Sequence, residues 1–133
     1  MPLVTPLIDP RTLDQIGLDR LVEHVLAGGV HGIFLLGTTG EGPGLGRRLQ
    51  QEMAEQACRK IAGWVPVLVG IADTSFADAV ELAHCADAAG ATTVVYAGPS
   101  YDPVAQAELL RHVARLAADS PLPLFSQTPS SSP

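Results

Sequence analysis

The sequence is poor in lysine, cysteine and aromatic residues, and it has no long apolar run. Of its eight basic residues only Lys60 is a lysine. Its two cysteines, Cys58 and Cys85, are too few for a disulfide framework, so we expect two free thiols. The net charge of −6 and the scattered arginines leave no basic cluster for a nucleic-acid backbone. No apolar run reaches the roughly 18 residues of a membrane span, and no leader-like segment opens the chain. We therefore expect a cytoplasmic protein with neither a nucleic-acid nor a membrane partner.

The composition is that of a folded domain. Hydrophobic residues make up 47% of the 133 residues and charged residues 17%, which excludes intrinsic disorder for most of the chain. The histidines show no ligand spacing, so no metal site is indicated. They are His24, His31, His84 and His112.

Short apolar runs alternate with longer segments of helical periodicity. The runs cover residues 3–7, 32–36, 65–71, 92–96 and 122–125, and we interpret them as strands buried on both faces. Helical spacing of apolar residues extends over 18–26, 46–62, 79–86 and 109–117. This order predicts an α/β fold with a parallel sheet. Two architectures fit: a doubly wound open sheet, and half of a barrel that needs about 250 residues when complete.

One motif stands at the end of the second predicted strand. It reads Gly37-Thr38-Thr39-Gly40-Glu41-Gly42 and precedes a helix. Adjacent hydroxyls, glycines and the amides of a strand-to-helix turn suit a small carboxylate. A simpler interpretation is that the threonines only cap the turn. The spacing matches neither a Walker loop nor the dinucleotide fingerprint.

Three further segments lie at the ends of other predicted strands and support the interpretation of this motif as part of a site. They are Val4-Thr5-Pro6, Gly70 with Asp73-Thr74-Ser75, and Pro99-Ser100-Tyr101. Together with Gly37-Thr38-Thr39-Gly40-Glu41 they resemble the dihydrodipicolinate synthase / N-acetylneuraminate lyase family of class I pyruvate aldolases, over about residues 2–125. The resemblance implies the N-terminal half of a TIM (β/α)8 barrel, about (β/α)4 plus strand 5, in residues 1–125.

The resemblance also implies residue roles. Thr38 and Thr39 would hold the carboxylate of a bound keto acid such as pyruvate. Thr38 and Tyr101 would be catalytic, as hydroxyls of a proton relay that Tyr101 completes across a dimer interface, and Gly70 would be a further position of the pocket wall. The implied substrate-binding set is Thr5, Gly37, Thr38, Thr39 and Gly40. A full-length member would be a homo-oligomer, a dimer or tetramer, with no cofactor beyond the covalent pyruvate Schiff base.

The chain departs from the family pattern near its end. The family has a tyrosine at the end of strand 5 and a Schiff-base lysine at the end of strand 6. Here Phe125 is followed by Ser126-Gln127-Thr128-Pro129, and neither residue is present. Lys60 lies on the helix before strand 3, near the opposite face of a barrel, where a solvated lysine stays protonated and non-nucleophilic. We expect residues 126–133 to be a disordered Ser/Pro tail or a non-native continuation.

Three hypotheses follow. In the first, the chain is a truncated pyruvate-dependent lyase or synthase that is inactive alone because the lysine and tyrosine are missing. In the second, it is a non-catalytic α/β module that binds a small carboxylate at Thr38-Thr39. In the third, it is a truncated or frameshifted product, whose half barrel leaves the edges of strands 1 and 5 unpaired.

Overall fold

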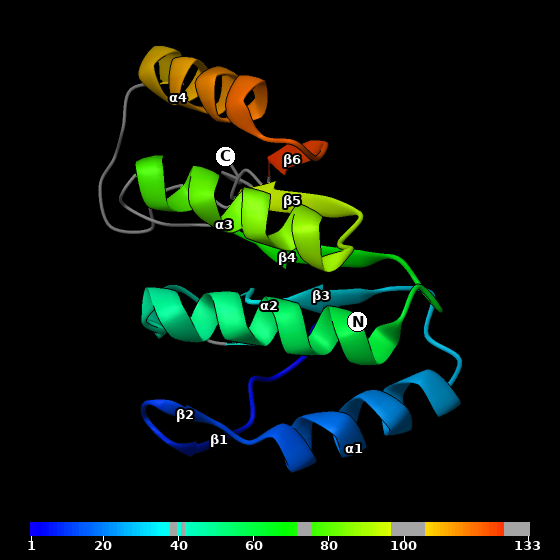
Figure 1. Ribbon diagram of the computed structural model, residues 1–133. Helices are drawn as coiled ribbons and strands as arrows, with labels where there is room; N and C mark the ends of the chain where they lie inside the picture. The colour runs from blue at the N-terminus through cyan, green and yellow to red at the C-terminus, as the bar shows by residue number, and fades with distance from the viewer. Residues whose placement is uncertain (38–39, 41, 72–75, 97–105, 127–133) are drawn as a thin grey trace, which may run out of the picture.

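The computed structural model describes residues 1–37, 40, 42–71, 76–96 and 106–126 (Figure 1). Its centre is a sheet of four parallel strands. They are β3 (Ile33–Leu35), β4 (Val67–Gly70), β5 (Thr93–Tyr96) and β6 (Leu124–Ser126), and their order in the sheet is their order in the chain. A doubly wound sheet reverses its strand order, whereas a barrel does not. The sheet is therefore a segment of a barrel, as the resemblance implied.

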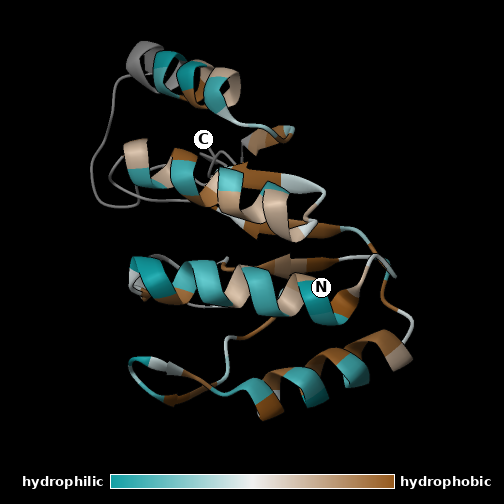
Figure 2. Cartoon of the chain, in the orientation of Figure 1, coloured by the Kyte–Doolittle hydropathy of each residue, from teal (hydrophilic) through white to brown (hydrophobic). Residues whose placement is uncertain are grey.

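Four helices alternate with the strands. They are α1 (Gln15–Ala27), α2 (Arg47–Ile61), α3 (Phe76–Ala89) and α4 (Gln106–Asp119). Each helix packs on the next one along the chain, and Figure 1 shows them stacked as one layer beside the sheet. Apolar and polar residues alternate along α1, α2 and α3, while the strands are mostly apolar (Figure 2). The predicted helices are confirmed, and their ends move by only a few residues.

The core lies between the sheet and the helices. Alternate residues of the strands point to this side, because successive side chains of a strand face opposite ways. Ile33, Leu35 and Val69 are fully buried there against Met53 and other helix residues. These contacts carry most of the apolar burial that stabilises the chain.

The opposite, inner side of the sheet is not a closed core. Phe34 and Leu68 stand side by side on it and are only half-buried. Val95 is in register with Phe125, which is 60% exposed. The prediction that the strands are buried on both faces is therefore wrong for β3, for β6 and at Leu68 of β4, but it is confirmed for β5, all of whose residues are buried. The helices cover only the other side, and β6 has β5 as its sole strand neighbour among the described residues.

The first predicted strand is also shorter than expected. Instead of a strand over residues 3–7, the structure has one parallel bridge, Pro2 with Phe34, flanked by a hydrogen bond from the Leu3 amide to the Phe34 carbonyl at 2.9 Å. Pro6 has no amide hydrogen to extend the ladder. Beyond it an unpredicted antiparallel hairpin forms, β1 (Leu7–Asp9) with β2 (Thr12–Leu13).

Helix ends use the expected devices. The Asp14 carboxylate accepts a hydrogen bond from the Gly17 amide at 2.9 Å and caps α1. Gly90 directly follows α3 and has φ +102°, a left-handed conformation that favours glycine. The cap of α2 is unusual, because Ala62 takes the left-handed conformation there with φ 52° and ψ 37°.

We expect Ala62→Gly to stabilise the chain by about 0.5–1 kcal/mol. A left-handed alanine carries a steric penalty that glycine lacks, and this penalty exceeds the extra chain entropy of glycine. Urea unfolding of the two proteins measures the difference. Ala114→Gly is the control, because Ala114 is an exposed residue within α4, where glycine is expected to cost about 1 kcal/mol. An Ala62→Gly variant as destabilised as this control would contradict the prediction.

Candidate functional site

The loop after β3 begins with a strained residue. Leu36 directly follows the strand and has a positive φ of 61°, although it is not a glycine. Such a conformation costs about 1–2 kcal/mol for a residue with a side chain. Leu36 is nevertheless only 3% exposed, and its side chain belongs to the core. The fold therefore imposes this bend, and it turns the chain at the carboxyl end of β3.

Glycines surround the bend because nothing larger fits. A methyl group on Gly42 would overlap the carbonyl oxygen of Leu36, and one on Gly70 would lie 2.6 Å from the same atom. Gly40 is similarly close to another part of the chain, because its methyl group would lie 2.7 Å from the carbonyl oxygen of Leu3. The backbone near Leu3 and the ends of β3 and β4 therefore lie close together.

Three hydrogen bonds hold the loop closed. The Thr5 hydroxyl donates to the Gly40 carbonyl at 2.6 Å. The Gly42 amide donates to the Gly37 carbonyl at 3.1 Å, which closes the segment between them. The side-chain amide of Gln50, on α2, donates to the Gly42 carbonyl at 2.7 Å. Hydrogen bonds therefore hold this loop, which we call the tied loop, at Gly37, Gly40 and Gly42.

Four of the predicted site positions come together here. Thr5, Gly37, Gly40 and Gly70 lie at the carboxyl ends of neighbouring strand segments, the rim where α/β barrels place their chemistry. Thr5 bonds to the loop itself rather than standing clear of it. Thr38, Thr39 and Tyr101, together with Glu41, fall outside the described residues.

The single lysine lies far from this rim. Lys60 is in the last turn of α2, which leads to the start of β4. Its ammonium group donates to the Glu23 carboxylate at 2.8 Å. This hydrogen bond raises the pKa of Lys60, which favours the protonated form. The residue is thus neither placed nor charged as a Schiff-base nucleophile would be.

The two cysteines are also unsuited to nucleophilic chemistry. Burial raises the pKa of the Cys58 thiol to about 11. Burial raises that of Cys85 to about 11 as well, with the nearby Glu55 carboxylate adding to the effect. Both thiols therefore stay protonated near neutral pH.

Neither a metal cluster nor a membrane span is found in the described part of the chain. Within it, no group of three or more His, Cys, Asp or Glu side chains could hold a metal ion. His112, for example, packs between the rings of Phe76 and Tyr96, with ring centroids 5.7 and 5.4 Å away. Among the same described residues, no helix combines the length and the apolar character needed to cross a membrane.

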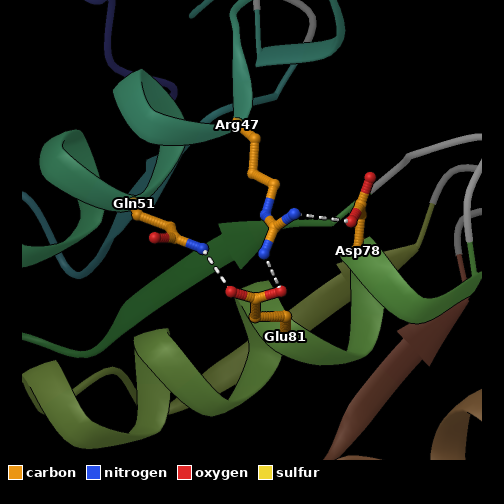
Figure 3. A network of polar contacts seen from close by, with 4 residues as sticks. All are labelled: Arg47, Gln51, Asp78 and Glu81. Atoms are coloured by element: carbon orange, nitrogen blue, oxygen red, sulfur yellow. Dashed lines mark hydrogen bonds and ion pairs between the residues drawn. The ribbon is translucent and has the colours of Figure 1, made fainter.

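A polar network joins the starts of α2 and α3 (Figure 3). Arg47 forms ion pairs with Asp78, at 3.3 Å, and with Glu81. Gln51 donates to the other oxygen of the Glu81 carboxylate at 3.3 Å. The hydrogen bond from Arg47, with a smaller effect of Gln51, lowers the pKa of Glu81 and keeps it charged. The network is exposed to solvent, so its contribution is mainly to orient the two helices.

Leu36 and Gln50 were not among the site residues predicted from the sequence. The bend at Leu36 has no signal in the sequence, because leucine gives no preference for the left-handed conformation. Gln50 did carry a signal. It shares the helical spacing of the buried Met53, Ala54 and Ile61, so a polar residue occupied an apolar stripe.

The chain belongs to the dihydrodipicolinate synthetase family, whose family model matches residues 1–129. Among curated relatives, the 4-hydroxy-tetrahydrodipicolinate synthase of Gluconacetobacter diazotrophicus is 35% identical over 123 residues, which are 92% of this chain and 41% of the relative. The chain thus spans about two fifths of the length of the curated relatives it matches.

Solved structures agree. The dihydrodipicolinate synthase of Bacteroides thetaiotaomicron is 50% identical, with a TM-score of 0.89 over 94% of this chain and 42% of that one. A prophage protein of the dihydrodipicolinic acid synthase family from E. coli K12, solved in complex with pyruvate, is 32% identical with the same TM-score and the same coverage of both chains. Both family and partial barrel are therefore as the sequence predicted.

Proposed function

We propose that this chain forms the carboxylate-binding part of a Schiff-base-forming, pyruvate-dependent lyase or synthase site. The observation that carries the proposal is the tied loop at the rim of the parallel sheet, in a chain of the dihydrodipicolinate synthetase family. The two threonines of this loop, Thr38 and Thr39, would hold the carboxylate of the keto acid. The relatives solved with pyruvate support this choice of ligand.

The rest of the chemistry requires a nucleophile that this chain lacks. In the proposed reaction a lysine amine condenses with the keto-acid carbonyl and releases water, and the resulting iminium stabilises the adjacent carbanion. Thr38 and Tyr101 would pass the protons of these steps. Lys60 is held by Glu23 away from the rim, so the lysine would come from the part of the family barrel that residues 1–133 do not include. We further propose that a full-length protein of this kind is a cytoplasmic homo-oligomer.

A non-catalytic module that binds a small carboxylate is the alternative. It is favoured by the same observation, a tied loop without a lysine nearby. Both proposals predict reversible binding of pyruvate to residues 1–133. They differ when residues that complete the barrel are added, because only the first predicts that a covalent adduct then forms.

We expect pyruvate and borohydride to leave the mass of the 133-residue chain unchanged. Borohydride reduces a pyruvate imine to a stable adduct, but a protonated lysine does not form the imine. Intact-mass spectrometry measures the result, and calorimetric titration of the same sample measures reversible pyruvate binding. Lys60→Arg is the matched control, because it keeps the charge beside Glu23 without an amine that can condense. An adduct present in the wild type and absent from this control would refute the assignment of Lys60, and a titration without heat of binding would refute both proposals.

A further inference from the structure

Gln50 is a buried polar residue in an apolar setting. It is 6% exposed, and among the described residues only Thr93 is another buried polar one. Its neighbours on the same side of α2 include Met53 and Ala54, both fully buried. Burying an amide costs free energy unless it is hydrogen-bonded. A glutamine at this position therefore needs a partner, and the partner it has belongs to the loop.

The hydrogen bond from Gln50 reaches the loop at Gly42, a residue that is itself bonded to Gly37. Its side-chain amide donates to the Gly42 carbonyl at 2.7 Å, while the Gly42 amide donates to the Gly37 carbonyl at 3.1 Å. Gly42 also packs against the carbonyl of Leu36, too closely for any side chain. Gly42 thus links Gln50 of α2 to Gly37 through two hydrogen bonds.

Gln50 and Thr5 bond to the loop from two different parts of the chain. Thr5 comes from the first strand segment and fixes Gly40, whereas Gln50 comes from α2 and fixes Gly42. The bond from Gln50 is buried and that from Thr5 is partly buried. A buried hydrogen bond is less weakened by competing water, so water competes less with the bond from Gln50 than with that from Thr5.

We propose that Gln50 is a positioning residue that fixes Gly42 relative to Gly37, and that it thereby sets the affinity of the site for a keto-acid carboxylate. The second half of this statement rests on the proposed function, and the first half does not. Gln50 touches the loop backbone and acts on the ligand only through it. Its role is thus distinct from that of the loop threonines.

The test compares three variants of the full 133-residue chain. Gln50→Met removes the donor at nearly constant size, and Gln51→Met does the same at the next residue, whose amide bonds to Glu81 instead. Gln50→Glu places a carboxyl group at the Gly42 carbonyl. Amide resonances of Gly37, Gly40 and Gly42 report the loop geometry, and titration with pyruvate reports its affinity.

We expect Gln50→Met to shift these glycine amides and to weaken pyruvate binding by up to about tenfold, the equivalent of one hydrogen bond. Gln51→Met is expected to change neither. Gln50→Glu should approach the wild-type spectrum at low pH, where a neutral carboxyl donates to Gly42, and depart from it as pH rises and the ionised carboxylate is repelled by the Gly42 carbonyl.

The outcomes separate the two proposals. Unchanged glycine amides in Gln50→Met, or equal changes in Gln51→Met, would overturn the role of Gln50 whatever happens to pyruvate. Wild-type chain that does not bind pyruvate would overturn the proposed function, while the glycine amides would still decide the role of Gln50. If Gln50→Met does not fold, Gln50→Glu decides: a pH-dependent return of the loop signals supports the proposal, and signals that do not vary with pH overturn it.

Discussion

Replacing Gly42 with alanine is expected to lower the free energy of unfolding by about 3 kcal/mol, the upper end of the usual cost of overpacking. The added methyl group would overlap the carbonyl oxygen of Leu36, which is backbone and cannot rotate away. Relief requires a shift of the loop, and that shift breaks the bonds of Gly42 to Gly37 and Gln50. Urea unfolding followed by circular dichroism measures the loss.

The matched control lies in the same short helix, η1 (Gly42–Gly44). A methyl group on Gly44 would meet nothing within 4 Å, so Gly44→Ala is expected to change the free energy of unfolding by less than about 0.5 kcal/mol. The pair therefore separates close packing at one glycine from a general preference of the turn for glycine. Equal effects of the two substitutions would show that the close contact at Leu36 is not what constrains the loop.

Leu35→Ala is expected to cost about 3–4 kcal/mol, whereas Leu68→Ala is expected to cost only about 1 kcal/mol. The two leucines lie on adjacent strands, but they point to opposite sides of the sheet. Leu35 is fully buried against the helices, and its removal leaves a cavity. Leu68 is half-buried on the inner side, as is its cross-strand neighbour Phe34. The free energies of unfolding of the two variants, extrapolated to zero urea, measure the difference.

This comparison also reports on what covers the inner side in solution. If the inner side stays open, the two costs differ as stated. If Leu68→Ala proves as costly as Leu35→Ala, some other polypeptide is packed on that side. A cost of Leu68→Ala that rises with protein concentration would identify that polypeptide as a second copy of the chain. Measurements at two protein concentrations about tenfold apart complete the experiment.

Much of the fold follows from local patterns. The strand β5 coincides with the predicted 92–96 to within one residue, and α2 coincides with 46–62, because period and bounding glycines are properties of the sequence itself. The grouping of Gly37, Gly40 and Thr5 in one site came from the family resemblance. From the sequence alone, only the family resemblance favoured a barrel over a doubly wound sheet.

Other features depend on contacts between distant segments and had no local signal. At the left-handed bend, the side chain of Leu36 belongs to the core, and its carbonyl lies where Gly42 and Gly70 have no side chain. The hairpin of β1 and β2 is defined by an antiparallel pairing of Leu7–Asp9 with Thr12–Leu13. The exposure of Phe125 depends on which side the helices occupy, which alternation along one strand does not reveal.

The four-stranded sheet ends at an edge strand, β6, and this affects which part of the molecule unfolds locally. β4 and β5 are each flanked by two strands, whereas β6 has β5 on one side and no strand on the other among the described residues. Likewise α4 packs against α3 without a further helix beyond it in the described part. We therefore expect slow hydrogen exchange in the middle of the row. The amides of β6 and α4 are expected to lose their protection first, through local fluctuations that leave the rest of the chain folded.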